Sequence, residues 1–179
     1  MVEFQELEHM AKLQNENNYR TKKITHKNFK KFGELISTIK KKPININNGY
    51  AKRFNNLCKI NTSIKKGSTI MSIFSAKKRK FPMTIKMMEE HPLGSQAFIP
   101  MNETTFLVFV SPRGKKPNVK KIESFIVPKQ MGVNYKSGIW HFPLISKKNM
   151  NFLVIDRKGK GNNLVIHNFK KEKIILKNG

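Results

Sequence analysis

Two histidines and one glutamate stand at spacings that could place their side chains together. In "MMEEHPLGSQAFIP" (87–100), Glu89 and His91 are two positions apart, so on a β-strand they point to the same face. Gln96 follows a Pro-Leu-Gly corner, which can bring its amide back toward that face. Histidine titrates near neutral pH and can act as general acid or general base, and a neighbouring glutamate can orient its ring. The segment therefore holds candidates for proton transfer.

A second candidate segment, "GVNYKSGIWHFPL" (132–144), carries His141. Gly138 allows a close backbone approach before a strand on which Trp140 and Phe142 face away from His141, so the two aromatic residues are expected to pack. A lone histidine on an apolar strand is more often a packed residue than a catalytic one. If the two segments are neighbours in a β-barrel, however, His141 converges with the first group.

Short runs typical of β-strands recur from residue 69 to residue 176. Turns rich in Asn, Gly, Pro and Lys separate them by about 8–12 residues, which is the pattern of an antiparallel sandwich or barrel. The expected strands are 69–75, 81–88, 95–101, 104–110, 123–127, 138–145, 151–157, 164–169 and 173–176. The sequence therefore predicts an all-β body.

One helix is expected before these strands. Phe29, Phe32, Leu35 and Ile36 recur at helical spacing, and Thr25 is a suitable N-cap. The spacing predicts one amphipathic helix over "THKNFKKFGELIS".

The composition favours one domain. A chain of 179 residues with 38% hydrophobic residues can build one core, expected over 19–179, preceded by a polar, acidic extension at 1–18. A single cysteine, Cys58, excludes an internal disulfide. No apolar run reaches the roughly 18 to 20 residues of a membrane-spanning helix, and the acidic N-terminus does not resemble a signal peptide. We therefore expect a cytoplasmic protein and no membrane partner.

The net charge of +25 resembles the footprint of a polyanion-binding protein. Only five of the 36 basic residues are Arg, however, and Arg is the residue favoured in base and phosphate contacts. A solvated lysine surface is the simpler interpretation. Specific nucleic-acid binding is not expected, and polyanion binding is kept as an alternative function.

The two histidine segments resemble the two sequence motifs of the cupin barrel. The first motif is His-x-His followed by four residues and Glu, and these places hold Glu89, His91 and Gln96. The second is Pro-x-Gly-x-x-His, and residues 136–141 read "KSGIWH". The resemblance implies a cupin-like antiparallel β-barrel or jelly roll. If a metal is bound, the implied ligands are Glu89, His91, Gln96 and His141. Glu is a good ligand for a divalent metal and neutral Gln a poor one, so the cofactor stays open.

Longer motifs resemble the ureidoglycolate lyase family, in its order and at about its spacing. They are "ITHKNFKKFGELI", "INNGYAKRF", "HPLGSQAFIPM", "FLVFV", "GVNYKSGIWHFPL" and "FLVIDR", between about residues 23 and 169. The resemblance implies a homodimeric enzyme that cleaves (S)-ureidoglycolate to glyoxylate and urea in allantoin breakdown. The alternatives are a related small acid as substrate or a cupin-like protein without catalytic activity.

The implied reaction is the collapse of a carbinolamide. A base takes the proton of the substrate hydroxyl, and an acid protonates the departing urea nitrogen. His91 and His141 suit both steps, and Glu89 can orient one of them. Tyr135 is expected to donate a hydrogen bond at the mouth of the site. The candidate catalytic residues are thus His91, His141, Glu89, Gln96 and Tyr135.

The substrate carboxylate requires a cation or a nest of amides. Arg53 offers a bidentate fork beside the turn of residues 47–49, so Arg53 and Asn48 are the substrate-binding candidates. The family usually has Arg after "SIF", where this chain has Ser75. If that Arg binds the carboxylate, then Arg53, Arg79 or a lysine must replace it.

The "VIDR" motif is expected to be structural. Asp156 and Arg157 are neighbours in the sequence, and we expect them to form an ion pair that closes one end of the barrel.

Overall fold

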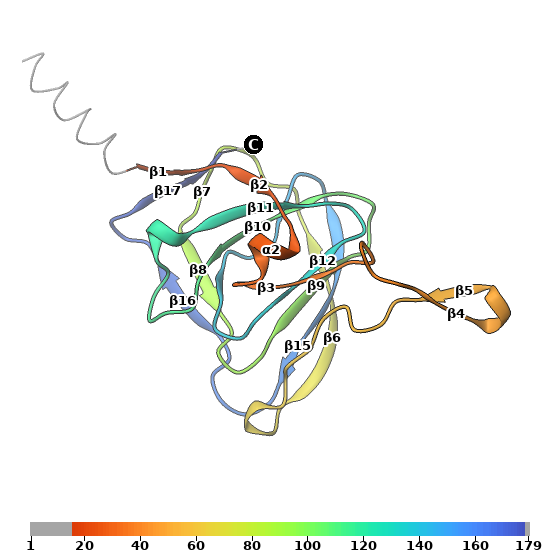
Figure 1. The fold of residues 1–179 in the computed structure, drawn as a ribbon. Helices are drawn as coiled ribbons and strands as arrows, with labels where there is room; N and C mark the ends of the chain where they lie inside the picture. Colours follow the sequence, from red (N-terminus) through yellow and green to blue (C-terminus); the bar gives the residue numbers. More distant parts are fainter. Residues whose placement is uncertain (1–15, 178–179) are drawn as a thin grey trace, which may run out of the picture.

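The computed structural model describes residues 16–177. Most of the acidic extension expected at 1–18 lies outside these residues, but residues 16–18 belong to strand β1 (Glu16–Tyr19). β1 pairs in parallel with β17 (Lys173–Leu176). β17 also pairs with β7 (Met83–Thr84), so a small three-stranded sheet joins the beginning and the end of the described chain (Figure 1).

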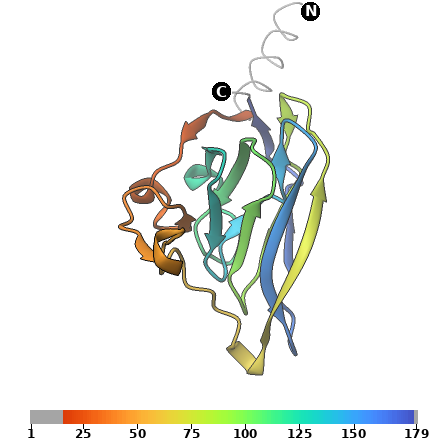
Figure 2. The same cartoon turned by 90° about the vertical axis from the view of Figure 1, so that its right-hand side faces the viewer.

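Two larger sheets form the body. The five-stranded sheet has the order β3 (Gly33–Ile36), β12 (Gly132–Tyr135), β9 (Gln96–Pro100), β15 (Met150–Lys158) and β6 (Ser68–Ala76). The seven-stranded sheet has the order β16 (Val165–Asn168), β8 (Met87–Glu90), β13 (Trp140–His141), β10 (Phe106–Ser111), β11 (Glu123–Val127) and β2 (Thr21–Lys23), and β14 (Ile145–Ser146) also pairs with β10. Figure 2 shows the long strands β6 and β15 side by side. The all-β, cupin-like prediction is confirmed.

Strand β10 lies at the centre of the core because both of its faces are buried. Phe106, Val108 and Val110 face the cluster between the two larger sheets. Leu107 and Phe109 belong to a second cluster, which lies under the small sheet and includes residues of β17. A continuous apolar run is what a strand covered on both faces requires. The sequence run 104–110 therefore marks the middle layer of the fold.

The expected helix over 25–37 is wrong in its second half. Helix α2 (His26–Phe29) is a single turn, capped by the predicted Thr25, whose hydroxyl accepts a hydrogen bond from the Asn28 amide at 3.1 Å. The chain then enters strand β3, which pairs with β12. A side chain at Gly33 would meet the backbone of β12, since a Cβ there would lie 2.1 Å from the Asn134 carbonyl oxygen. Strand pairing through this glycine overrides the helical spacing.

Two expected strands are each divided in the structure. The run 81–88 contains β7 and β8, and the run 138–145 contains β13 and β14. The first divides because the Ile85 amide binds the Ile174 carbonyl of the small sheet, after which the chain crosses to the seven-stranded sheet. This change of sheet depends on a long-range partner and leaves no local signal, whereas β13 and β14 both pair with β10 within one sheet.

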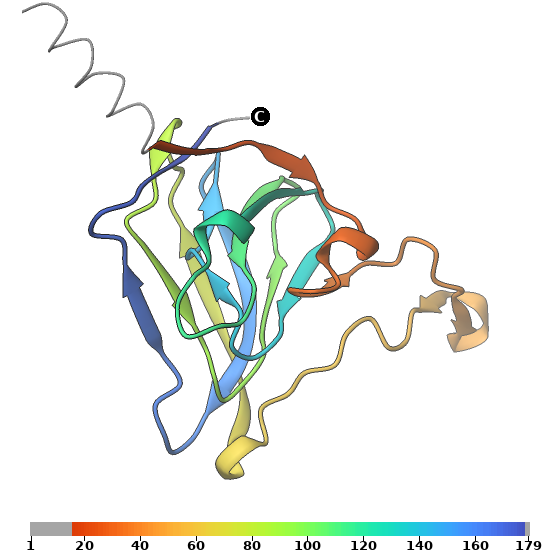
Figure 3. The same ribbon diagram turned by 60° about the vertical axis from the view of Figure 1, so that its left-hand side comes forward.

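A hairpin projects from the body. Strands β4 (Ile44–Ile46) and β5 (Ala51–Arg53), joined by the 3-10 turn η1 (Asn47–Gly49), stand away from the sheets in Figures 1 and 3. Two further 3-10 turns, η2 (Ile64–Lys66) and η3 (Val119–Lys121), lie in connecting loops. Within residues 16–177, no helix has the length and apolar character needed to cross a membrane.

Candidate active site

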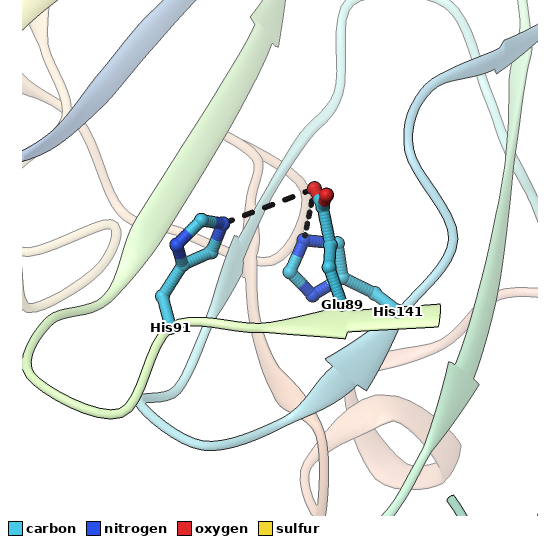
Figure 4. A group of neighbouring side chains, drawn as sticks. All are labelled: Glu89, His91 and His141. Atoms are coloured by element: carbon cyan, nitrogen blue, oxygen red, sulfur yellow. Dashed lines mark ion pairs between the residues drawn. The ribbon is translucent and has the colours of Figure 1, made fainter. Parts of the chain in front are cut away.

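The structure brings Glu89, His91 and His141 together (Figure 4). Glu89 on β8 stands directly opposite His141 on β13, and His91 follows β8 on the same face as Glu89. The Glu89 Oε1 atom lies 3.6 Å from Nε2 of His141 and 3.9 Å from Nε2 of His91. The convergence expected from the spacing of the two segments is therefore present.

The backbone fixes which nitrogen of each imidazole faces the carboxylate. Nδ1 of His91 lies 2.6 Å from the Asn163 carbonyl oxygen, and Nδ1 of His141 lies 3.0 Å from that of Ile139. A carbonyl oxygen only accepts, so each Nδ1 carries the hydrogen. The Nε2 atom of each neutral ring is then a lone pair directed at Glu89, and both Nε2 atoms are buried without a hydrogen-bond partner among the described residues. The two Nε2 lone pairs and the Glu89 carboxylate repel one another, and a proton or a cation between them would remove this repulsion.

The local charges act strongly on one another. Burial and the nearby His141 lower the pKa of His91. Burial by itself would raise the pKa of Glu89, but the neighbouring imidazoles of His141 and His91 outweigh burial and lower it. At neutral pH the site therefore holds a carboxylate beside a neutral His91.

A cavity of about 500 Å³ opens beside Glu89 and Gln96. Its walls also include five apolar side chains and four polar or basic ones, namely Phe74, Ala76, Phe98, Pro143 and Leu144, with Ser75, Lys77, Lys78 and Arg79. Three cations against the single carboxylate of Glu89 make this cavity attractive to a small anion. Its volume suits a small organic molecule.

Gln96 is brought to the predicted place. Its side chain lines the cavity and is largely buried, and Oε1 has no hydrogen-bond partner within residues 16–177. Gln96 on β9 stands opposite Tyr135 on β12.

Tyr135 is not at the mouth of the site, contrary to the expectation. Its ring is buried in the core and stacks on the His141 imidazole, with ring centroids 4.4 Å apart and an angle of 20° between the planes. Burial and the charge of Glu89 raise the pKa of its hydroxyl. All four residues of β12 are buried, and the strand is covered on both sides by β3 and β9, which explains the difference.

Arg53 and Asn48 are not brought to the cavity. Both belong to the projecting β4–β5 hairpin and are exposed. Asn47, Asn48 and Gly49 all have positive φ angles, so this turn closes the hairpin rather than forming an anion-binding nest at the site. The direction in which the β4–β5 hairpin projects from the sheets cannot be predicted from the sequence of the hairpin.

Arg79 is the arginine that the structure places at the cavity. Its guanidinium lies 5.7 Å from the centre of the Phe142 ring. Ser75, which stands where the family usually has Arg, also lines the cavity and donates a hydrogen bond to the Asn151 amide oxygen at 2.7 Å. Of the two arginines that the sequence offers for the substrate carboxylate, the structure therefore favours Arg79 over Arg53.

The expected ion pair between Asp156 and Arg157 is wrong. Arg157 donates through Nε and Nη2 to the Ile64 carbonyl and through Nη2 to the Lys160 carbonyl, and no ion pair joins it to Asp156 within the described range. Neighbouring residues on a strand point to opposite faces, which separates the two side chains. Asp156 instead shares a face with the buried Phe152 and Val154, and this alternation was the signal that sequence reasoning missed.

The three convergent side chains also fit a divalent metal ion. Glu89, His91 and His141 each offer one ligand atom, and these atoms lie within 4.8 Å of one another. Each histidine is oriented by a hydrogen bond from its other nitrogen to a carbonyl oxygen, as metal-binding histidines usually are. Two imidazoles and one carboxylate suit a transition metal, and Gln96 could add a weak amide oxygen.

Comparison with known proteins gives a consistent result. The family model described as ureidoglycolate lyase matches residues 16–176. The chain is 41% identical over 155 residues to a ureidoglycolate lyase of Pseudomonas fluorescens, covering 86% of this chain and 93% of that protein. It is 42% identical over 154 residues to one of Pseudomonas aeruginosa, covering 86% and 91%. It is 40% identical over 156 residues to one of Pseudomonas putida, covering 87% and 93%. Because the match includes both histidine segments and nearly the whole described fold, the chain belongs to the ureidoglycolate lyase family.

Proposed function

We propose that this chain cleaves ureidoglycolate to glyoxylate and urea in the cavity beside Glu89, His91 and His141. One observation carries the proposal: in a member of the ureidoglycolate lyase family, two buried imidazole nitrogens face one carboxylate beside a cation-lined cavity. These are the groups that proton transfer on a small organic anion requires.

The reaction needs one proton removed and one proton added. Loss of the hydroxyl proton allows the carbon–oxygen double bond of glyoxylate to form as the carbon–nitrogen bond breaks, and the departing nitrogen takes up a proton to give urea. The site returns to its original protonation state, and no water is consumed. The Nε2 atoms of His91 and His141 are the candidates that accept and donate, and Glu89 lies within 4 Å of both, where it holds either ring when that ring is charged.

The cations of the cavity are suited to the substrate carboxylate. We assign this role to Arg79, because its guanidinium can bind a carboxylate through two parallel hydrogen bonds, with Lys77 and Lys78 adding positive charge nearby. Apolar side chains such as Phe74 and Phe98 cover the rest of the wall and lower the local dielectric constant, which strengthens these interactions.

A metal ion is compatible with the same residues. Glu89, His91 and His141 would hold it, with Gln96 as a further ligand. When bound, a divalent metal supplies Lewis-acid polarisation of substrate oxygen atoms.

The homodimer stays a proposal, and strand β6 supports it. β6 is the edge of the five-stranded sheet, nine residues long and uncharged, in a chain of which 26% is charged. Met71 is 70% exposed and Ile73 is 54% exposed on its outer face. Edge strands without charge or proline invite pairing, and two copies of one strand can pair antiparallel across a two-fold axis. A cytoplasmic location likewise stays a prediction.

The test is an assay of the full chain with racemic ureidoglycolate, in which glyoxylate and urea are measured. We expect turnover well above the spontaneous rate. His141→Asn should lower kcat by about 100-fold or more, since a positioned acid or base contributes that much. His167→Asn, which changes a histidine on β16 outside the cavity, should leave turnover intact. Absence of turnover with and without added divalent metal would reject the proposal.

A further inference from the structure

We propose that Asp156 recognises the ureido group of the substrate by accepting hydrogen bonds from its terminal nitrogen. This inference rests on the proposed function and adds a specificity residue to it. Asp156 is the only aspartate in the chain, and the proton transfers assigned to His91 and His141 do not involve it.

The register of the five-stranded sheet places Asp156 beside Gln96. Ile155 on β15 pairs with Ala97 on β9, and Val154 pairs with Phe98, so the next residues along the two strands are Asp156 and Gln96. Val154 and Phe98 are both buried in the cluster between the two larger sheets. Because side chains alternate along a strand, Asp156 and Gln96 face the same interior.

Asp156 also lies near the candidate catalytic group. Its negative charge acts on His91 across the interior of the fold. Gln96 lines the cavity, and Asp156 is its neighbour across the β9–β15 pair. Asp156 is thus a neighbour of the site, whereas Arg157, the next residue of β15, donates to carbonyl oxygens of the surrounding loops.

The Asp156 carboxylate lacks a donor. Its Oδ1 atom is buried without a hydrogen-bond partner within residues 16–177, and Oε1 of Gln96 is in the same condition. Buried acceptors are nearly always paired in folded proteins, and an unpaired carboxylate oxygen is especially costly. Two adjacent unpaired acceptors therefore indicate a ligand, or water that a ligand displaces, carrying N–H donors.

Of the groups on ureidoglycolate, the ureido end meets this requirement. Its terminal nitrogen carries two N–H donors, whereas the substrate carboxylate would be repelled by Asp156. The cavity is lined by the cations Lys77, Lys78 and Arg79 and by the acceptor Gln96, beside which Asp156 stands on β15. The cations are suited to the substrate carboxylate, and the acceptors Gln96 and Asp156 are suited to its ureido group.

The experiment compares ureidoglycolate with an analogue whose terminal ureido nitrogen carries two methyl groups and no hydrogen. Both substrates are given to wild type and to Asp156→Asn, and kcat/KM is measured. We expect wild type to prefer ureidoglycolate by about tenfold or more, as sites built to bind a donor reject analogues that lack it. Asp156→Asn should lose about tenfold on ureidoglycolate and little on the analogue. Glu103→Gln changes an exposed carboxylate outside the cavity lining and should behave as wild type.

Two further readouts separate recognition from a structural role or from an effect on His91. Urea should inhibit wild type more strongly than Asp156→Asn, whereas inhibition by glyoxylate, which lacks the ureido group, should be equal in both. If Asp156→Asn loses activity equally on both substrates, Asp156 does not read the ureido group. If wild type accepts the dimethyl analogue as well as ureidoglycolate, the inference also fails, whatever the variant does. A wild type without any turnover would instead reject the proposed function.

Discussion

The imidazole of His141 stacks on the phenol ring of Tyr135, with ring centroids 4.4 Å apart. The same imidazole is fixed at Nδ1 by the Ile139 carbonyl and faces Glu89 through Nε2. His141 is 2% exposed, so its position is determined by packing as well as by hydrogen bonds. Tyr135 therefore supports the His141 imidazole by stacking on it. The sequence had instead suggested that Tyr135 donates a hydrogen bond at the mouth of the site.

Substitutions at Tyr135 should therefore separate the ring from the hydroxyl. Tyr135→Phe keeps the stack and should retain kcat within a few-fold. Tyr135→Ala leaves a cavity beside His141 and should lower both kcat and the free energy of unfolding, the latter by about 3–5 kcal/mol, as for other large aromatic truncations. Steady-state kinetics and thermal denaturation of both variants provide the check. A loss of 100-fold or more in Tyr135→Phe would show that the hydroxyl takes part in the reaction.

Arg79 and Arg53 should differ in their effect on substrate affinity. Arg79→Gln removes a cation from the cavity wall and should raise KM for ureidoglycolate by about tenfold or more, because a charge-assisted bond is lost. Arg53→Gln changes an exposed residue of the hairpin and should leave KM for ureidoglycolate equal to that of wild type. The pair is a matched comparison, since each variant removes one guanidinium. The reverse result would restore the sequence-based assignment of Arg53.

The alternation of side chains in the sequence predicted part of the convergence of Glu89, His91 and His141. Glu89 and His91 share a strand face by their spacing alone, and the match to cupin motifs indicated that His141 would meet them. Asp156 could have been found by the same alternation, but its neighbour Arg157 suggested a local ion pair. The strand face decides against that pairing, because the two side chains point in opposite directions.

The predictions that were wrong concern segments whose structure depends on contacts with residues distant in the sequence. Gly33 begins a strand because β12 approaches its backbone, although the surrounding apolar residues have helical spacing. Arg53 does not line the cavity because it belongs to the β4–β5 hairpin, which projects from the body (Figure 1). Neither the partner strand nor the direction of a hairpin is encoded in a local pattern.

Glu123 should make part of the stability depend on pH. Burial alone would raise its pKa, but Lys31 and Lys22, which bind its two carboxylate oxygens, outweigh burial and lower the pKa below the usual 4.5. A lowered carboxyl pKa stabilises the folded state above pH 4.5, and this contribution is lost as the pH falls through the lowered pKa. Glu123→Gln should thus be less stable than wild type at pH 7 by about 1 kcal/mol, given partial exposure.

The measurement for Glu123 is urea denaturation from pH 7 down to pH 3. The difference between wild type and Glu123→Gln should shrink below pH 4.5. The more exposed Glu103, with its side chain 70% exposed, provides the control, and Glu103→Gln should show a smaller difference throughout. A difference that persists unchanged at low pH would mean that the glutamine perturbs packing rather than an ion pair.

The outer face of β6 should control self-association. Ile73→Lys places a charge in the uncharged edge strand and should shift the chain from dimer to monomer, since like charges would meet across a two-fold axis. Ile166→Lys on β16, at a site that is 50% exposed, is the matched control and should keep the dimer. Light scattering after size-exclusion chromatography gives the mass directly. A monomeric wild type, or a dimeric Ile73→Lys, would exclude this strand as the interface.

Glu89 should determine whether the histidine pair binds a metal ion. Its carboxylate lies close to both imidazole Nε2 atoms, and a divalent cation between the three would neutralise Glu89 and satisfy both lone pairs. Calorimetric titration of the full chain with Zn²⁺ should give one tight site, and the ion should raise the melting temperature by binding only the folded state. Glu89→Gln keeps the size of the side chain but removes its charge, and it should weaken Zn²⁺ binding by at least about tenfold. Loss of a group that only orients a metal ligand already costs this much, and loss of the ligand itself costs more. His167→Asn should bind as wild type does. If Glu89→Gln bound Zn²⁺ as tightly as wild type, the ion would bind elsewhere in the protein. A proton shared by His91 and His141 would then occupy the space between the two imidazoles and Glu89.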